Sequence, residues 1–251
     1  MRATHTVAHP VGFHTATEVS SPIRLSLLRG FELTCDGLRV PVVLGVQRLL
    51  AFLALQERAV PRVYIAGVLW PDVTEDRALG NLRSALWRLR RPALSTVESA
   101  SEHLCLSPLV RVDLHDARDM ASRLLDARSP CAEEALDRRA FEGELLPGWY
   151  DDWLLLERER HRQLSLHALE ALCERLTAAG RFGEAVLAGM AAVNAEPMRE
   201  SAQRLLIRAH LREGNRGEAL RQYRLYVDLL RRELGLEPSE AITELVNGAC
   251  H

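Results

Sequence analysis

Short strand-like segments open the main part of the chain. The runs IRLSLL at 23–28 and FELTC at 31–35 predict strands, and Asp36-Gly37, just before LRVPVVL, is a typical hairpin signal. From Gln47 the apolar spacing changes to that of a helix. The apolar face of this first predicted helix consists of Leu49, Leu50, Phe52, Leu53 and Leu55.

Two further helices and a pair of strands complete this region. VYIAGVLW at 63–70 predicts a short second helix. Thr74, followed by two acidic residues, is a typical start for a third helix, which Pro92 ends. Residues 94–98 and 102–112 are predicted to be strands. Strands, three helices and a terminal hairpin in this order indicate a winged helix-turn-helix.

Nearly all of the sequence after Asp113 has helical periodicity, and it contains an internal repeat. GRFGEAV at 180–186 matches GNRGEAL at 214–220 with an offset of 34 residues, the period of tetratricopeptide (TPR) helix pairs. A third, degenerate copy is predicted near Ser129. The sequence therefore predicts a mainly α protein in three parts: a disordered leader over 1–22, an α+β winged helix-turn-helix over 23–112, and an all-α, TPR-like repeat domain over 113–247.

Charge is divided unevenly between these parts. The chain has 32 arginines, no lysine and 34 acidic residues, which gives a formal net charge of −2. Residues 22–91 hold 11 arginines and 6 acids, net +5, whereas residues 92–251 hold 20 arginines and 27 acids, net −7. A basic N-terminal part and an acidic C-terminal part indicate two units with different partners.

The most basic segment is the third predicted helix, which ends in NLRSALWRLRR at 81–91. An apolar stripe would face the core, and the opposite side carries Arg77, Asn81, Ser84, Arg88 and Arg91, with Arg83, Trp87 and Arg90 in a neighbouring row. Arginine and asparagine make bidentate hydrogen bonds to guanine and adenine, so this face can read base edges in a major groove. Arg48, at the start of the first helix, is predicted to hold a phosphate. A solvated surface without a ligand is the alternative at both places.

Motifs that suggest an enzyme have simpler structural interpretations. WYDDW at 149–153 places two carboxylates between tryptophans, and an N-cap at Asp151 or Asp152 with the tryptophans in the core is preferred to a sugar-cleaving site. His103 and Cys105 share one strand face without further ligands nearby. The sequence contains neither a P-loop GxxxxGK[ST] nor a GxSxG motif. We expect no enzymatic activity, no cofactor and no bound metal.

Cysteine usage and hydropathy indicate the cellular compartment in which the protein is expected. The five cysteines are scattered without a CxxC motif, which is typical of a reduced intracellular protein rather than a disulfide framework. Residues 1–21 lack the apolar run of a secretory signal, and no window reaches the roughly 18 apolar residues of a membrane span. We expect a cytoplasmic protein with no membrane partner.

Six segments carry a resemblance to a known family. They are GFELTCDGLRVPV, QRLLAFLAL, VLWPDVTEDRALGNLRSALWRLRR, VDLHDARDM, GELLPGWYDDWLLLERER and EALRQYRLYVDLLRRELGLEPSEAI. Residues 23–112 resemble the OmpR-type winged helix of the Streptomyces antibiotic regulatory protein (SARP) family. Residues 113–247 resemble the bacterial transcriptional activator domain that follows it in that family.

The resemblance implies a transcription activator. Its third helix would enter the major groove of direct repeats in double-stranded promoter DNA, and the protein would help to recruit RNA polymerase. The recognition role would fall on Arg77, Asn81, Arg83, Ser84, Arg88 and Arg91. Only the end of this helix, from Arg88 to Arg91, matches the family pattern closely.

Two features depart from the family pattern and keep an alternative open. The predicted wing, within VESASEHLCL at 97–106, carries Glu98 and Glu102 but no arginine, so it is expected to add little DNA affinity. The second helix begins at Pro61-Arg62 without a Ser or Thr cap. The alternative is a TPR-type interaction adaptor whose winged helix docks on the repeats, with Trp87 in the contact, and no longer reads DNA. A homodimer is compatible with both interpretations.

Overall fold

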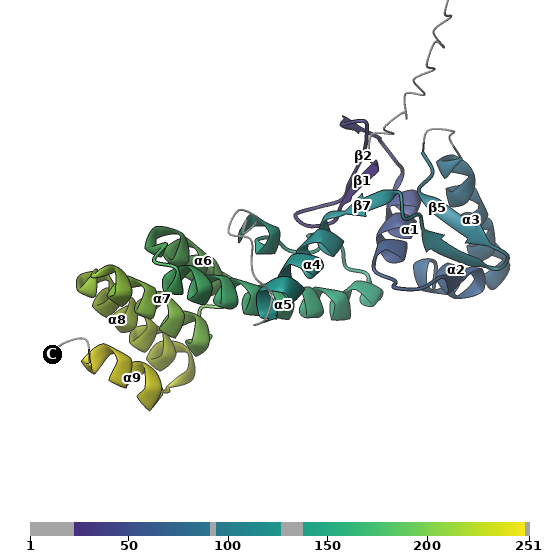
Figure 1. Ribbon diagram of the computed structural model, residues 1–251. Coiled ribbons are helices and arrows are strands. Elements are labelled where there is room, and N and C mark those ends of the chain that lie inside the picture. The colour runs from purple at the N-terminus through teal and green to yellow at the C-terminus, as the bar shows by residue number, and fades with distance from the viewer. Residues whose placement is uncertain (1–22, 91–93, 127–137, 249–251) are drawn as a thin grey trace, which may run out of the picture.

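The computed structural model describes residues 23–90, 94–126 and 138–248. The predictions for the leader, for Arg91 and Pro92, and for a third repeat copy near Ser129 lie outside the described residues. The molecule is elongated, with a mixed α/β part at one end and stacked helices at the other (Figure 1). Across the described ranges, none of the helices combines the length and hydropathy that a membrane span requires.

The α/β part has the element order predicted for a winged helix-turn-helix. Its two sheets have the strand orders β3-β2-β1-β7 and β4-β6-β5. Its elements are β1 (Ile23–Ser26), β2 (Glu32–Cys35), β3 (Leu38–Arg39), α1 (Leu44–Ala54), β4 (Val60–Pro61), α2 (Arg62–Leu69), α3 (Glu75–Leu89), β5 (Val97–Ala100), β6 (His103–Leu106) and β7 (Val110–Val112). The fold predicted for this part is confirmed.

Strand pairing confirms one turn and corrects one strand. Cys35 pairs with Leu38, so Asp36 and Gly37 form a two-residue turn in which both have positive φ, 54° and 74°, as in a type I′ hairpin. The single strand predicted over 102–112 is wrong, because the chain turns after β6 and begins a new strand, β7. β7 pairs with β1 in parallel, which returns the chain to the first sheet just before the helical part.

The helical part contains the predicted repeat. Its elements are α4 (Asp113–Leu125), the 3-10 helix η2 (Arg138–Phe141), α5 (Asp152–Ala178), α6 (Phe182–Ala195), α7 (Glu200–Glu213), α8 (Arg216–Leu234) and α9 (Glu240–Asn247). The pairs α5–α6 and α7–α8 correspond to the two matched units. Gly180 and Gly214 follow the first helix of each pair with φ of 76° and 92°, a left-handed conformation that glycine adopts without strain.

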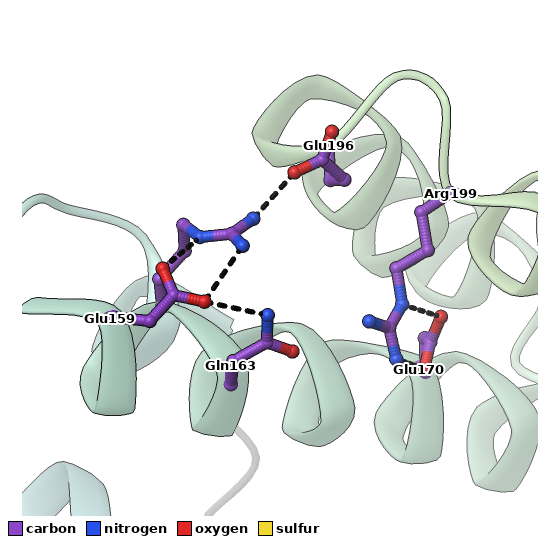
Figure 2. A network of polar contacts seen from close by, with 6 residues as sticks. Glu159, Gln163, Glu170, Glu196 and Arg199 are labelled. Atoms are coloured by element: carbon purple, nitrogen blue, oxygen red, sulfur yellow. Dashed lines mark hydrogen bonds and ion pairs between the residues drawn. The ribbon is translucent and has the colours of Figure 1, made fainter.

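Ion pairs fasten the repeat helices to one another (Figure 2). Arg199, which precedes α7, donates two hydrogen bonds of 2.7 and 3.0 Å to the carboxylate of Glu170 on α5. Burial acts to raise the pKa of Glu170, but the bonds from Arg199 and Ser201 outweigh it and lower the pKa. Arg162 on α5 likewise bonds to Glu196 at the end of α6. These arginines are therefore neutralised by carboxylates within the chain.

The apolar core continues from the α/β part into the helical part. The cluster that holds β1 and α1–α3 also contains Leu145, Leu146 and Leu154, from between η2 and the start of α5, and the half-buried Trp149 and Trp153 pack against it. Phe31 stacks on Trp149 with ring centroids 6.1 Å apart, and Phe52 meets Trp153 edge-on at 5.4 Å. We call Leu145, Leu146, Trp149, Trp153 and Leu154 the joint, because they share one core with the winged helix.

Backbone hydrogen bonds reinforce the joint. The carboxylate of Asp113, at the start of α4, accepts hydrogen bonds from the N–H groups of Leu27 (2.8 Å) and Leu28 (3.2 Å) after β1. The N–H of Leu146 donates to the carbonyl of Leu27 at 2.8 Å. Three segments that are distant in sequence are therefore held together where the two parts meet.

Burial of His161 on α5 predicts a pH dependence of stability. The ring is 4% exposed, and its Nε2 lies 3.2 Å from the carbonyl oxygen of Gly143. Burial lowers the pKa of His161 below its ordinary value of 6.5, and the positive charge of Arg118 acts in the same direction. Below pH 6.5 the unfolded chain therefore takes up a proton that the folded chain does not, so the free energy of unfolding falls as the pH drops through this window.

This effect is measured by urea unfolding at pH 7.5 and pH 5.5. In the original chain, the free energy of unfolding should fall by up to about 1.4 kcal/mol for each pH unit below pH 6.5 within this window. Replacing His161 by Gln is expected to remove this dependence. His103, which is exposed on β6, gives the matched control H103Q. Identical pH curves for the original chain and H161Q would contradict the prediction.

Candidate nucleic-acid interface

The third helix turns its apolar side into the core of the winged helix. Ala78, Leu82, Ala85 and Leu89 are all at most 5% exposed, and α3 packs against α1 and α2. Thr74 precedes the helix as predicted, although its side chain makes no capping hydrogen bond. The packing fixes which side of α3 faces outward.

The outward side carries most of the residues predicted to bind DNA. Arg77, Arg83, Ser84 and Arg88 are exposed, and Asn81 is half-buried. α3 ends at Leu89, so Arg90 occupies the capping position and is also exposed. We call Arg77, Asn81, Arg83, Ser84, Arg88 and Arg90 the α3 basic face. The sequence interpretation gave Arg90 no role, although the run RLRR contains it.

The arginines of the α3 basic face have no carboxylate partner in the described ranges. Among the described residues, none of Arg77, Arg83, Arg88 and Arg90 forms an ion pair or a side-chain hydrogen bond. In the helical part, by contrast, arginines such as Arg118 and Arg199 pair with glutamates at 2.9 and 2.7 Å. Unpaired guanidinium groups on one helix side form a region of positive potential that favours a polyanion.

Small residues accompany these arginines on α3. The hydroxyl of Ser84 donates to the carbonyl of Gly80 at 3.0 Å, which leaves its oxygen as an acceptor on the surface. A Cβ added at Gly80 would come within 4 Å of only the guanidinium of Arg83, at 3.8 Å. Because these side chains are small, a flat or grooved partner can approach the backbone in the middle of α3 closely.

The wing is less acidic than its own sequence suggests. The hairpin of β5 and β6 carries Glu98 and Glu102, as predicted. Arg62, the first residue of α2, donates to the hydroxyl of Ser99 at 2.7 Å and so brings a guanidinium group to the wing. Glu98 accepts a hydrogen bond of 3.3 Å from Ser107. Sequence reasoning missed Arg62 because the contact joins residues 37 positions apart.

The structure does not place Arg48 with the other predicted residues. α1 begins at Leu44 rather than near Gln47, so Arg48 lies in the second turn, beyond the strongest effect of the helix dipole. Its guanidinium pairs with Asp151, the residue before α5, and its side chain is 23% exposed. Asp151 has the predicted N-cap position but makes no capping bond. Phosphate binding by Arg48 stays a prediction, and it would require this ion pair to open.

Trp87 does not form the contact that the adaptor alternative predicted. Its side chain is 72% exposed, and it borders a shallow pocket with Val43 and with Arg88 and Arg90. The winged helix does pack on the helical part, but through the joint. This docking leaves the α3 basic face open.

No metal site is found in the part of the chain that the structure describes. Within those residues, no three His, Cys, Asp or Glu side chains are grouped so that they could hold an ion. His103 and Cys105 lie on β6 as predicted, where His103 is exposed. The polar chemistry available at α3 is therefore that of guanidinium, amide and hydroxyl groups.

Comparisons with known proteins agree with this architecture. Residues 109–248 match the family described as the bacterial transcriptional activator domain. The chain is 31% identical over 245 residues to the regulatory protein AfsR of Streptomyces coelicolor, and 28% identical over 238 residues to AfsR of Streptomyces griseus. These alignments cover 93% and 90% of this chain. The chain spans about a quarter of the length of each relative, 25% and 24%.

A solved structure shares the fold. It is that of Mycobacterium tuberculosis EmbR in complex with a low affinity phosphopeptide, with a TM-score of 0.62 and 21% sequence identity. The similarity covers 91% of this chain and 65% of EmbR. The α/β part and the helical part therefore occur together, in this order, in another protein of known structure.

Proposed function

The chain belongs to the SARP family of transcriptional regulators with a bacterial transcriptional activator domain, and on this premise we propose that it binds promoter DNA in a sequence-specific manner through α3. The observation that carries the proposal is the α3 basic face. Its four arginines are exposed and have no carboxylate partner among the residues that the structure describes, and they lie on the helix that a winged helix presents to DNA. A B-form major groove is about 12 Å wide and admits one α-helix.

The residues of α3 divide into two roles in this proposal. Arg77, Asn81 and Arg88 lie along one side, where they would face base edges, with Arg to guanine and Asn to adenine as the favoured pairs. Arg83 and Arg90 lie on the flank and would bind phosphates, which positions the helix without reading sequence. Arg62 would bring a further positive charge to the wing.

Recruitment of RNA polymerase is the second part of the proposal. We propose that the protein acts as an activator on direct repeats, with the helical part offering a surface to the transcription machinery or to a second copy. The support is the family membership and the presence, in one chain, of a helix with an outward basic side and a repeat stack that shares a core with it through the joint. Repeat stacks are suited to binding other proteins along extended surfaces.

Selection of bound fragments from genomic DNA tests the proposal. Fragments that survive repeated binding should share half-sites in direct repeat, and their affinity, measured by fluorescence anisotropy, should fall steeply with salt. Six phosphate contacts would give a slope near −5 in log affinity against log salt, at about −0.9 for each contact. Recovery of random fragments, or binding that is insensitive to salt, would contradict sequence-specific DNA binding.

A further inference from the structure

A pocket of about 810 Å³ lies in the helical part, away from α3. One wall is the segment from η2 to Leu145, which we call the strap, and the other walls are α5 and α6. Its lining is mainly apolar and includes Phe141, Leu155, Leu166, Leu187, Met190 and Ala191. The volume is in the range of pockets that enclose small organic molecules, about 300–1,000 Å³.

Large apolar side chains surround the pocket and remain open to solvent. Leu155 on α5 is 59% exposed, and Leu187 and Met190 on α6 are 45% and 46% exposed. Single exposed apolar residues are ordinary on protein surfaces, but a group around one concave site indicates a place where a partner or ligand binds.

The charged residues of the pocket already neutralise one another. Arg138 pairs with Glu142 at 2.9 Å. Arg162 pairs with Glu159 at 2.9 Å and also with Glu196, which lies outside the pocket lining; Figure 2 labels both glutamates. A charged ligand would therefore find no unpaired opposite charge on these arginines and glutamates. The balance favours an uncharged ligand.

One buried polar side chain in the lining keeps a free hydrogen-bonding atom. His161 is 4% exposed and lines the pocket. Its Nε2 lies 3.2 Å from the carbonyl of Gly143, which can only accept, and 3.5 Å from the hydroxyl of Ser165. Nε2 is therefore the N–H of the neutral ring, and Nδ1 is the acceptor, which has no partner among the described residues. Nδ1 is not one of the fully buried atoms that lack a partner in the described ranges, so it remains accessible, and in a residue that lines the pocket it is the acceptor we assign to a ligand N–H or O–H.

We propose that this pocket binds an uncharged, mainly apolar small molecule that donates one hydrogen bond to Nδ1 of His161. The site is separate from the α3 basic face, and the proposal does not rest on DNA binding. It also has a connection to the winged helix, because the strap contacts Arg29. The guanidinium of Arg29 donates to the carbonyls of Glu142 (2.9 Å) and Arg139 (2.7 Å). A ligand against the strap would thus touch a segment that the winged helix also holds.

The fluorescent probe N-phenyl-1-naphthylamine tests the site on the full chain. It is uncharged and apolar, and its single N–H matches the proposed donor. We expect saturable binding at one site, with a dissociation constant on the order of 10 µM. The absence of saturable binding would overturn the proposal.

Three variants locate the binding. L187W places a bulky ring at the pocket and should weaken the probe at least about tenfold, whereas L225W makes the same change at a residue of α8 that is 52% exposed and outside the pocket lining, and should have no effect. H161L puts an apolar side chain in place of the imidazole and so removes the acceptor, which should weaken binding several-fold, the effect of about one lost hydrogen bond. Equal weakening in L187W and L225W, or full affinity in both L187W and H161L, would overturn the assignment.

Discussion

Replacing Arg83 and Arg88 together by alanine is expected to lower the affinity for promoter DNA roughly 100-fold, about tenfold for each guanidinium. Both side chains are exposed on α3 and have no carboxylate partner among the described residues, so DNA would be their first strong anionic contact. The salt dependence should also weaken, by about one unit of slope for each phosphate that the protein no longer neutralises. Fluorescence anisotropy at several salt concentrations measures both quantities.

The matched control removes the same formal charge from another part of the chain. Arg212 on α7 and Arg224 on α8 are also exposed, and neither forms an ion pair among the described residues. The variant R212A/R224A should keep its affinity within about twofold, because only non-specific attraction would change. If both double variants bound DNA equally weakly, net charge rather than the α3 basic face would account for binding.

Replacing Leu146 by alanine is expected to lower the free energy of unfolding by about 2–5 kcal/mol. Leu146 is fully buried in the joint, in one core cluster with the strands and helices of the winged helix. The shortened side chain would leave a cavity in this core that the surrounding side chains cannot fill without moving. Urea unfolding monitored by far-UV circular dichroism gives the change directly.

Leu156 provides the comparison for this prediction. It lies on α5 and is 59% exposed, so L156A should change stability by no more than about 0.5 kcal/mol. A small effect of L146A, close to that of L156A, would mean that the two parts do not share a core in solution. Two separate unfolding transitions in the original chain would lead to the same conclusion.

Sequence patterns predicted those elements of the fold that are determined by residues close together in the chain. The hairpin at Asp36-Gly37, the glycines that end the first helix of each repeat and the helix that begins after Thr74 depend on residues close together in sequence. The division of 102–112 into β6 and β7 depends on pairing with β1, about 90 positions away, which no local pattern contains. In α8 the most buried aromatic side chain is Tyr226, because α7 and α9 cover that side of the helix, and this packing is likewise absent from the local pattern.

For the candidate site, the sequence also predicted what depends on local periodicity, but not what depends on contacts between distant residues. Amphipathic periodicity identified the outward side of α3, since an apolar stripe must face a core. Charge counting could not show which arginines are paired, because pairing is a tertiary property. Among the described residues, the arginines of α3 have no carboxylate partner, whereas most of those in the helical part have partners. Arg48 illustrates this limit, since its partner Asp151 lies 103 positions away.

The joint has a consequence for how copies of the protein would be arranged on a promoter. Because both parts share one core, the angle at which α3 would enter a groove would also set the direction in which the repeat stack leaves the duplex. Copies on sites separated by whole turns, about 10.5 base pairs each, would extend their stacks from the same side. An insertion of about half a turn would place neighbouring stacks on opposite sides. Rotational phase, more than distance along the DNA, would then decide whether neighbouring copies touch.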